Sequence, residues 1–181
     1  METDDYGLER KFCRGVKPVQ LAEGLRIEGY ASLFGEPDRG GDVVQPGAYA
    51  DSLARIAARG GSVKMLWQHD PSQPIGVWDE IAEDARGLRV KGRLLPRVAR
   101  AREAAALVSA GAIDGLSIGY RTIRADRNAQ GQRLLAELDL WEVSLVTFPM
   151  LGTARVAAKA TAPWHDLAAA LRAATAELAA R

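Results

Sequence analysis

Short stretches that alternate between apolar and polar residues recur along this chain, and they constrain its fold more than any other feature. Such alternation puts successive side chains on opposite faces of a β-strand, so one face of each stretch is predicted to be buried. The stretches are residues 25–34, 62–68, 75–78, 88–94, 116–123 and 134–148. A chain with this pattern is predicted to contain about six strands.

Helical spacing of apolar residues predicts helices between and after these strands. A short helix carries Tyr49 on its apolar face and ends near Gly60, and a second one ends at Gly111. Residues 163–180 form an alanine-rich amphipathic stretch that begins at a proline. Because strands and helices do not alternate regularly, the fold class is predicted to be mainly β with helices (α+β), as an antiparallel sheet or small barrel with helices outside.

Composition excludes several classes of protein. Its 24 Lys and Arg against 23 Asp and Glu give a net charge of +1, which argues against a dedicated nucleic-acid coat. One cysteine and two histidines argue against a closed zinc site, and neither a metal ion nor another cofactor is predicted. No signal peptide pattern and no apolar run of about 20 residues occurs, so we expect a cytoplasmic protein without a membrane segment.

His69 is a candidate general base. It follows the predicted strand 62–68 and precedes Asp70-Pro71, a place where proline is expected to stop the strand and hold a loop. The alternative is a partly exposed loop histidine without a chemical role. Scarcity favours a function, because the other histidine, His165, lies near the start of the stretch 163–180.

Ser117 is a candidate nucleophile in a strand of large apolar residues. Its neighbours Gly115 and Gly119 lack side chains, which would let the backbone of a peptide substrate approach closely. A serine hydroxyl attacks only with the help of a base such as His69 within hydrogen-bond reach. The structural alternative is a core serine whose hydroxyl binds a backbone group.

Glu142 lies in an apolar run where an unpartnered carboxylate would be costly to bury. An imidazole would be a suitable partner, because a carboxylate orients a histidine base and stabilises its cation. The alternative is a structural ion pair with an arginine. Asp70, Asp114 and Asp139 are rivals for the orienting role.

Seven basic residues lie within residues 86–102. They would suit a contact with an acidic protein or a nucleic acid, but we interpret them as the solvated face of a strand and a helix. A nucleic-acid-binding surface would also carry aromatic residues, and this segment has none.

Four segments together resemble the prohead protease of tailed bacteriophages, the serine protease of capsid maturation. They are GYASLFGEPDRGGDVVQPGAYADSL (29–53), MLWQHDPSQPIGVW (65–78), DGLSIGYR (114–121) and LWEVSLVTFPM (140–150). Their order and spacing extend the resemblance over about 25–157. The same module occurs in prophages and in phage-derived gene transfer agents.

The resemblance implies a fold like that of the herpesvirus assemblins, a small antiparallel β-barrel surrounded by helices. It also implies a serine endopeptidase that works inside the immature capsid in the host cytoplasm. The implied partners are the major capsid protein with its scaffolding segment, which would be cleaved along with the protease itself. A homo-oligomer is left open, and a capsid scaffold or chaperone without catalysis is the alternative.

The resemblance also implies roles for single residues. His69 in WQHD would be the general base, Ser117 in GLSIGY the nucleophile and Glu142 in WEVS the orienting carboxylate. Related enzymes use an arginine-bearing segment for the oxyanion, for which Arg121 and Arg155 are candidates. On this interpretation residues 1–157 form the protease domain, and 158–181 form a connector and a C-terminal amphipathic helix.

Overall fold

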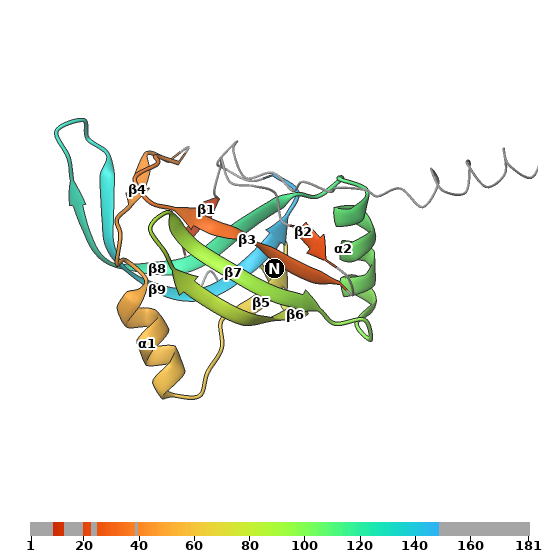
Figure 1. Ribbon diagram of the computed structural model, residues 1–181. Helices are drawn as coiled ribbons and strands as arrows, with labels where there is room; N and C mark the ends of the chain where they lie inside the picture. Colours follow the sequence, from red (N-terminus) through yellow and green to blue (C-terminus); the bar gives the residue numbers. More distant parts are fainter. Residues whose placement is uncertain (1–8, 13–19, 23–24, 39, 149–181) are drawn as a thin grey trace, which may run out of the picture.

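A curled sheet of nine strands organises the described part of the chain (Figure 1). The structure is a computed structural model, and it describes residues 9–12, 20–22, 25–38 and 40–148. The elements are β1 (Glu9–Phe12), β2 (Gln20–Ala22), β3 (Arg26–Leu33), β4 (Asp42–Val44), α1 (Ala50–Ala58), β5 (Lys64–Trp67), β6 (Asp70–Glu83), β7 (Gly87–Leu94), α2 (Ala99–Ser109), β8 (Gly115–Arg127) and β9 (Arg133–Val146).

The strand order in the sheet is β1-β8-β9-β5-β6-β7-β3-β2, and β4 also pairs with β9. Most neighbouring strands are antiparallel, whereas β9 runs parallel to both β4 and β5. Figure 1 shows the two helices of the described residues at opposite ends of the curled sheet. The parallel pairing of β5 with β9 places the end of β5, next to His69, beside β9.

The mainly β prediction with additional helices is confirmed. The strands predicted at 25–34 and 88–94 are β3 and β7, and the predicted glycine stops are correct because Gly60 and Gly111 both have positive φ after a helix. A closed barrel surrounded by helices stays a prediction, since the third predicted helix (163–180) lies outside the described residues. Neither helix in the described ranges has the length and hydropathy of a membrane-spanning helix.

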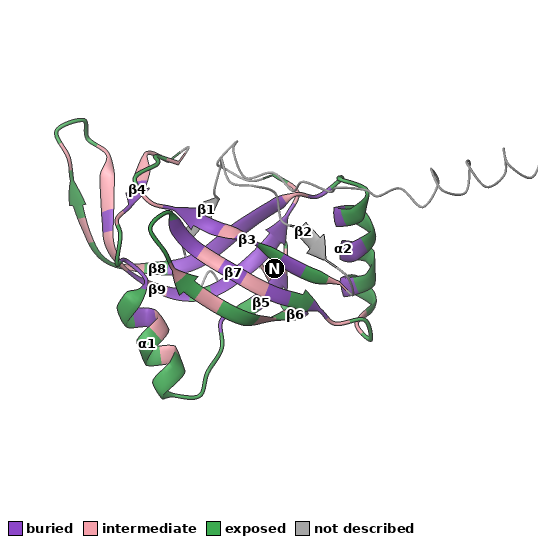
Figure 2. Ribbon diagram, in the orientation of Figure 1, coloured by how far each residue is buried: buried purple, intermediate pink, exposed green. Residues whose placement is uncertain are grey.

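The core lies where β8 and β9 are buried on both faces (Figure 2). Every residue of β8 from Gly115 to Tyr120 is buried, and so is every residue of β9 from Glu142 to Val146. Polar residues in these two half-strands are therefore surrounded by protein. The buried polar or charged residues within them are Ser117, Glu142 and Ser144.

The turn between β5 and β6 differs from the prediction. We expected Pro71 to end the strand and hold a loop, but β6 begins at Asp70 and runs through Pro71 and Pro74. The pairing of β5 with β6 shifts register on both sides of Leu66, which is paired with Pro74. This interrupted pairing explains why β6 can contain prolines, because proline is tolerated where a ladder hydrogen bond is missing.

Candidate active site

His69 lies in a two-residue turn that joins β5 to β6. Trp67 pairs with Asp70, so Gln68 and His69 are the central residues of this hairpin, and their φ angles are 54° and 63°. Tight hairpins of this kind usually place glycine or asparagine at such positions. A glutamine and a histidine there are strained, so surrounding contacts must hold the turn.

Contacts with the end of β9 supply that support through Gln68. Its backbone N–H donates to the carbonyl of Leu145 at 2.9 Å, and its side-chain amide donates to Oγ1 of Thr147 at 2.6 Å. The backbone N–H of Thr147 in turn donates to Oε1 of Gln68 at 3.3 Å. The turn is thus fastened to the last residues of the sheet.

The His69 ring contacts the Glu142 carboxylate. Nδ1 of His69 lies 2.5 Å from Oε1 of Glu142, and the two side chains are only 6% and 7% exposed. A hydrogen bond to a carboxylate that is this short and this buried is among the strong ones in proteins. Of the two partners considered for Glu142, the structure provides the imidazole rather than an arginine.

The second oxygen of Glu142 contacts a serine that sequence reasoning did not single out. Oγ of Ser144 donates to Oε2 of Glu142 at 2.5 Å and accepts a hydrogen bond from the backbone N–H of His69 at 3.2 Å. Glu142 and Ser144 are two residues apart on β9, so their side chains share one face of the sheet. The signal that could have identified Ser144 is this Glu-x-Ser spacing in an apolar run.

Strand pairing places Ser117 beside this network. In the antiparallel pair β8–β9, Ser117 is opposite Ser144 and Gly119 is opposite Glu142. Directly opposed residues project to the same face with Cβ atoms about 4.5–5.5 Å apart. The three predicted residues therefore converge on one buried face, where Ser117 itself is 0% exposed. Their catalytic roles stay a prediction.

Gly119 has a different role from the one expected. We interpreted the missing side chain as room for a substrate backbone, but the Glu142 side chain takes that room. A Cβ at Gly119 would lie 2.8 Å from Cδ and 2.9 Å from Cγ of Glu142, and closer still to Oε1. A glycine at this position leaves room for the Glu142 side chain to lie over β8, where its carboxylate contacts Nδ1 of His69.

Two rivals for the orienting role have other partners. Asp70 accepts hydrogen bonds from the Ser72 hydroxyl, the Ser72 backbone and the Gln73 amide, which lower the pKa of its carboxyl. Asp139 accepts hydrogen bonds from Ser52 and Trp141. The third rival, Asp114, immediately precedes β8.

Of the two oxyanion candidates, the structure describes Arg121, which lies on β8 four residues after Ser117. The guanidinium of Arg121 lies 5.5 Å from the ring centre of Trp141. The pairing of β8 with β9 shifts register between Gly119 and Tyr120, which leaves Trp141 as an extra residue on β9, and alternation along β8 puts Arg121 on the same face as Ser117 and Gly119. Arg155, like His165, lies outside the described residues.

The basic segment 86–102 is largely ion-paired. Its side chains meet carboxylates of neighbouring strands and of its own helix in the pairs Arg89–Glu28, Lys91–Glu80, Arg93–Asp79 and Arg100–Glu103. These pairs are about half exposed, which is typical of a solvated surface. This agrees with the interpretation of the segment as a solvated face.

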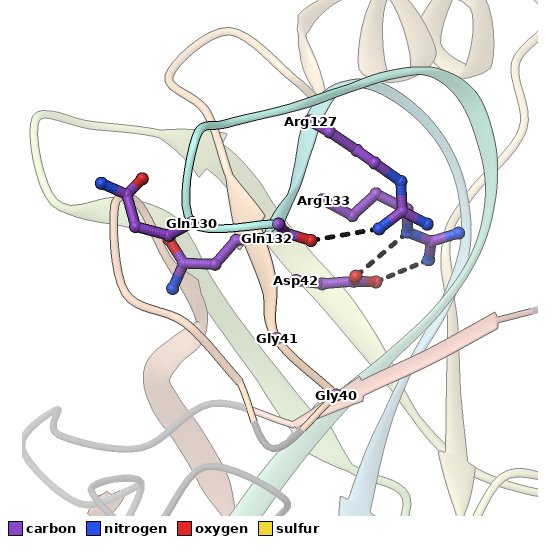
Figure 3. A pocket seen from close by; sticks show the side chains of 8 residues that line it. Gly40, Gly41, Asp42, Arg127, Gln130, Gln132 and Arg133 are labelled. Carbon is purple, nitrogen blue, oxygen red and sulfur yellow. Dashed lines mark hydrogen bonds and ion pairs between the residues drawn. The ribbon is translucent and has the colours of Figure 1, made fainter.

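A separate hollow of about 560 Å³ lies at the turn that joins β8 to β9 (Figure 3). Arg133 binds Asp42 there with contacts of 3.0 and 2.5 Å, and Arg127 donates to the carbonyl of Gly131 at 3.1 Å. Within the described ranges, no group of three or more His, Cys, Asp or Glu side chains could hold a metal ion. The Arg133–Asp42 ion pair is part of the lining of this hollow.

Known proteins resemble this chain in both sequence and fold. It is 35% identical over 135 residues to the prohead protease of Enterobacteria phage HK97, an alignment that covers 73% of this chain and 59% of that protein. The chain thus spans less than two thirds of that relative's length. The structure of the bacteriophage T4 capsid assembly protease has a similar fold, with a TM-score of 0.58 at 16% identity over 78% of this chain and 99% of that chain.

A family model provides the broadest match. The model of the caudovirus prohead serine protease matches residues 16–165, a range that contains the resemblance predicted over 25–157. This match spans most of the chain, including β3 to β9 and the residues around His69, Ser117 and Glu142. The chain therefore belongs to the family of caudovirus prohead serine proteases.

Proposed function

We propose that this chain is a serine endopeptidase in which Ser117 is the nucleophile, His69 the general base and Glu142 the orienting carboxylate. The observation that carries the proposal is the buried 2.5 Å contact between His69 and Glu142, beside the strand position of Ser117. A carboxylate on one ring nitrogen and a serine near the other is the arrangement that activates a hydroxyl for acyl transfer.

The proposed mechanism follows from the proton on Nδ1. Glu142 accepts the hydrogen bond from Nδ1–H, which leaves Nε2 of the neutral ring as the basic atom. As Oγ of Ser117 attacks the scissile carbonyl carbon, Nε2 takes the hydroxyl proton, and Glu142 stabilises the imidazolium that forms. The ring then gives this proton to the leaving amine. Water, activated by the same nitrogen, hydrolyses the acyl-enzyme.

The proposed substrates are the scaffolding region of the major capsid protein and the protease chain itself. Family membership supports this, and the similar proteins are named a prohead protease and a capsid assembly protease. We propose that cleavage takes place inside the immature capsid in the host cell. The partner surfaces would then be segments of capsid protein.

Incubation of the protein with the capsid protein encoded beside it tests the proposal. A shortened capsid protein should appear with the parent chain and be absent with Ser117→Ala. Oγ of Ser117 is a single buried hydroxyl, so a circular dichroism spectrum and melting curve should show that the variant folds. Cleavage at the parent rate by Ser117→Ala would refute the assignment of the nucleophile.

The same experiment separates catalysis from the alternative of a capsid scaffold or chaperone. A chaperone would promote assembly of proheads equally well in the parent and in Ser117→Ala, with no shortened product in either. A protease requires the product in the parent alone.

A further inference from the structure

Ser144 is the buried polar residue of the site that has no role in the mechanism above. It is 0% exposed, it lies directly opposite Ser117, and its hydroxyl makes two hydrogen bonds. One goes to the carboxylate of Glu142 at 2.5 Å and the other comes from the backbone of His69 at 3.2 Å. One hydroxyl thus joins the strand that carries the carboxylate to the turn that carries the base.

The direction of these bonds argues against Ser144 as a second nucleophile. A hydroxyl has one proton, and that of Ser144 is directed to Oε2 of Glu142. A nucleophile must instead deliver its proton to Nε2 of His69, on the side of the ring away from Glu142. Ser144 lies on the carboxylate side of the network.

The two hydrogen bonds of Ser144 support the strained turn that carries His69. His69 has a φ of 63°, and its backbone position decides where the imidazole lies relative to Glu142. The bond from His69 N–H to Ser144 holds that backbone, and the bond from Ser144 to Oε2 holds the carboxylate against rotation. Without the hydroxyl, both halves of the His69–Glu142 pair would lose one restraint.

We propose that Ser144 is a positioning residue that fixes His69 and Glu142 relative to each other. The inference rests on the proposed function, because positioning has a consequence for rate only if His69 acts as the base. Misplacement of a catalytic group by about 1 Å lowers the rate about 10²-fold. We therefore expect Ser144→Ala to lower kcat by about 10- to 100-fold and to leave KM nearly unchanged.

The pH profile provides a readout that a purely structural role would not change. Ser144→Ala loosens the His69–Glu142 pair, so the carboxylate attracts the imidazolium of His69 less strongly. The acid limb of the kcat/KM profile should therefore move to lower pH in Ser144→Ala.

Ser52→Ala is the matched control. Ser52 is also 0% exposed, its hydroxyl accepts from a backbone N–H of β9, that of Leu140 at 2.9 Å, and it donates to a carboxylate, that of Asp139 at 3.4 Å. Ser52 lies on α1, and its partners Leu140 and Asp139 lie on β9. The control therefore removes a hydroxyl that has the same kinds of partners but lies away from Glu142. It should show the same order of melting-temperature loss as Ser144→Ala, with the parent pH profile and kcat.

A second variant and a spectroscopic signal keep the test decisive. Ser144→Cys has nearly the same shape and a weaker donor, so it replaces Ser144→Ala if the latter does not fold. Proton NMR of the parent should show a strongly downfield signal from the His69 ring N–H bound to Glu142. We expect this signal to shift or broaden in the Ser144 variants and to persist in Ser52→Ala.

The outcomes separate this inference from the proposed function. An alkyl fluorophosphonate should react with Ser117 in the parent and more slowly with Ser117 in Ser144→Ala, with loss of fluoride. Labelling of Ser144, or a Ser144→Ala variant with parental kcat, pH profile and NMR signal, would overturn the positioning role alone. A parent chain that neither cleaves the capsid protein nor reacts with the fluorophosphonate would overturn the proposed function. The NMR comparison would then still test whether Ser144 positions His69 relative to Glu142.

Discussion

Gly119→Ala should displace the Glu142 carboxylate while the side chains of Ser117, His69 and Glu142 all stay chemically unchanged. The new methyl carbon would lie 2.8 Å from Cδ and 2.9 Å from Cγ of Glu142, whereas carbon atoms in proteins pack at about 3.5–4.0 Å. The side chain must therefore move by about 0.5–1 Å. Both of its oxygens make 2.5 Å hydrogen bonds, so a movement of this size weakens or breaks them.

The expected magnitude follows from those two bonds. A hydrogen bond to a charged group contributes about 1.5–3 kcal/mol net, so partial loss of two should lower the free energy of unfolding by about 2–4 kcal/mol. For a chain of this size that corresponds to a fall in melting temperature of roughly 5–15 °C. Misplacing the carboxylate should also lower kcat/KM for capsid-protein cleavage about 10²-fold.

Two comparisons make the assay specific. Gly61→Ala is the control, because a Cβ there would have ordinary contacts of 3.5 and 3.6 Å with Ile56, and it should melt and cleave like the parent. In a chain that already carries Glu142→Ala, adding Gly119→Ala should cost little, since the atoms it collides with are gone. Parental stability and parental kcat/KM in Gly119→Ala would refute the reasoning.

Three further predictions concern the groups around the site. His69→Ala should abolish cleavage as fully as Ser117→Ala does, and the double variant should be scarcely slower than either, because residues that act as a unit are not additive in rate measurements. Thr147→Val should remove the 2.6 Å bond that anchors Gln68, lower the unfolding free energy by about 1 kcal/mol and lower kcat; an unchanged kcat would show that the turn is held without it. Bonds from Ser72 and Gln73 lower the pKa of Asp70 below its usual value, so the folded state favours the carboxylate. This stability is complete above the unfolded-state pKa and is lost as pH falls through the lower folded-state pKa. Asp70→Asn should therefore flatten the decline of melting temperature in acid, and an identical decline in both chains would contradict this role.

The sequence predicted those parts of the fold that depend on local patterns. Alternation located β3 and β7, and glycines with positive φ end α1 and α2 as expected. Polar strand extensions were missed. The strand expected at 116–123 is β8 (Gly115–Arg127), whose last residues are mostly exposed and lack an apolar face to reveal them. The short strand β4 was missed because it lies in a stretch dominated by glycine and proline.

The sequence predicted which residue types form the candidate site, but not all of the contacts between them. A histidine, a serine and a buried glutamate suggested a catalytic group, and the contact of His69 with Glu142 agrees with that. Ser144 and Gly119 were not assigned their contacts because those depend on the register between β8 and β9. Similarly, the pattern of residues does not reveal a turn at Gln68 and His69, because both are unusual with positive φ.

The parallel pairing of β5 with β9 has a consequence for how the protein matures. It joins segments far apart in the chain, and long-range parallel pairs of this kind are slow to form because loop closure costs entropy. His69 meets Glu142 only when β9 has docked beside β5. With His69 as the proposed base, a newly synthesised chain would have no assembled base until its sheet is complete, and this would protect the unfolded chain and its neighbours from early cleavage.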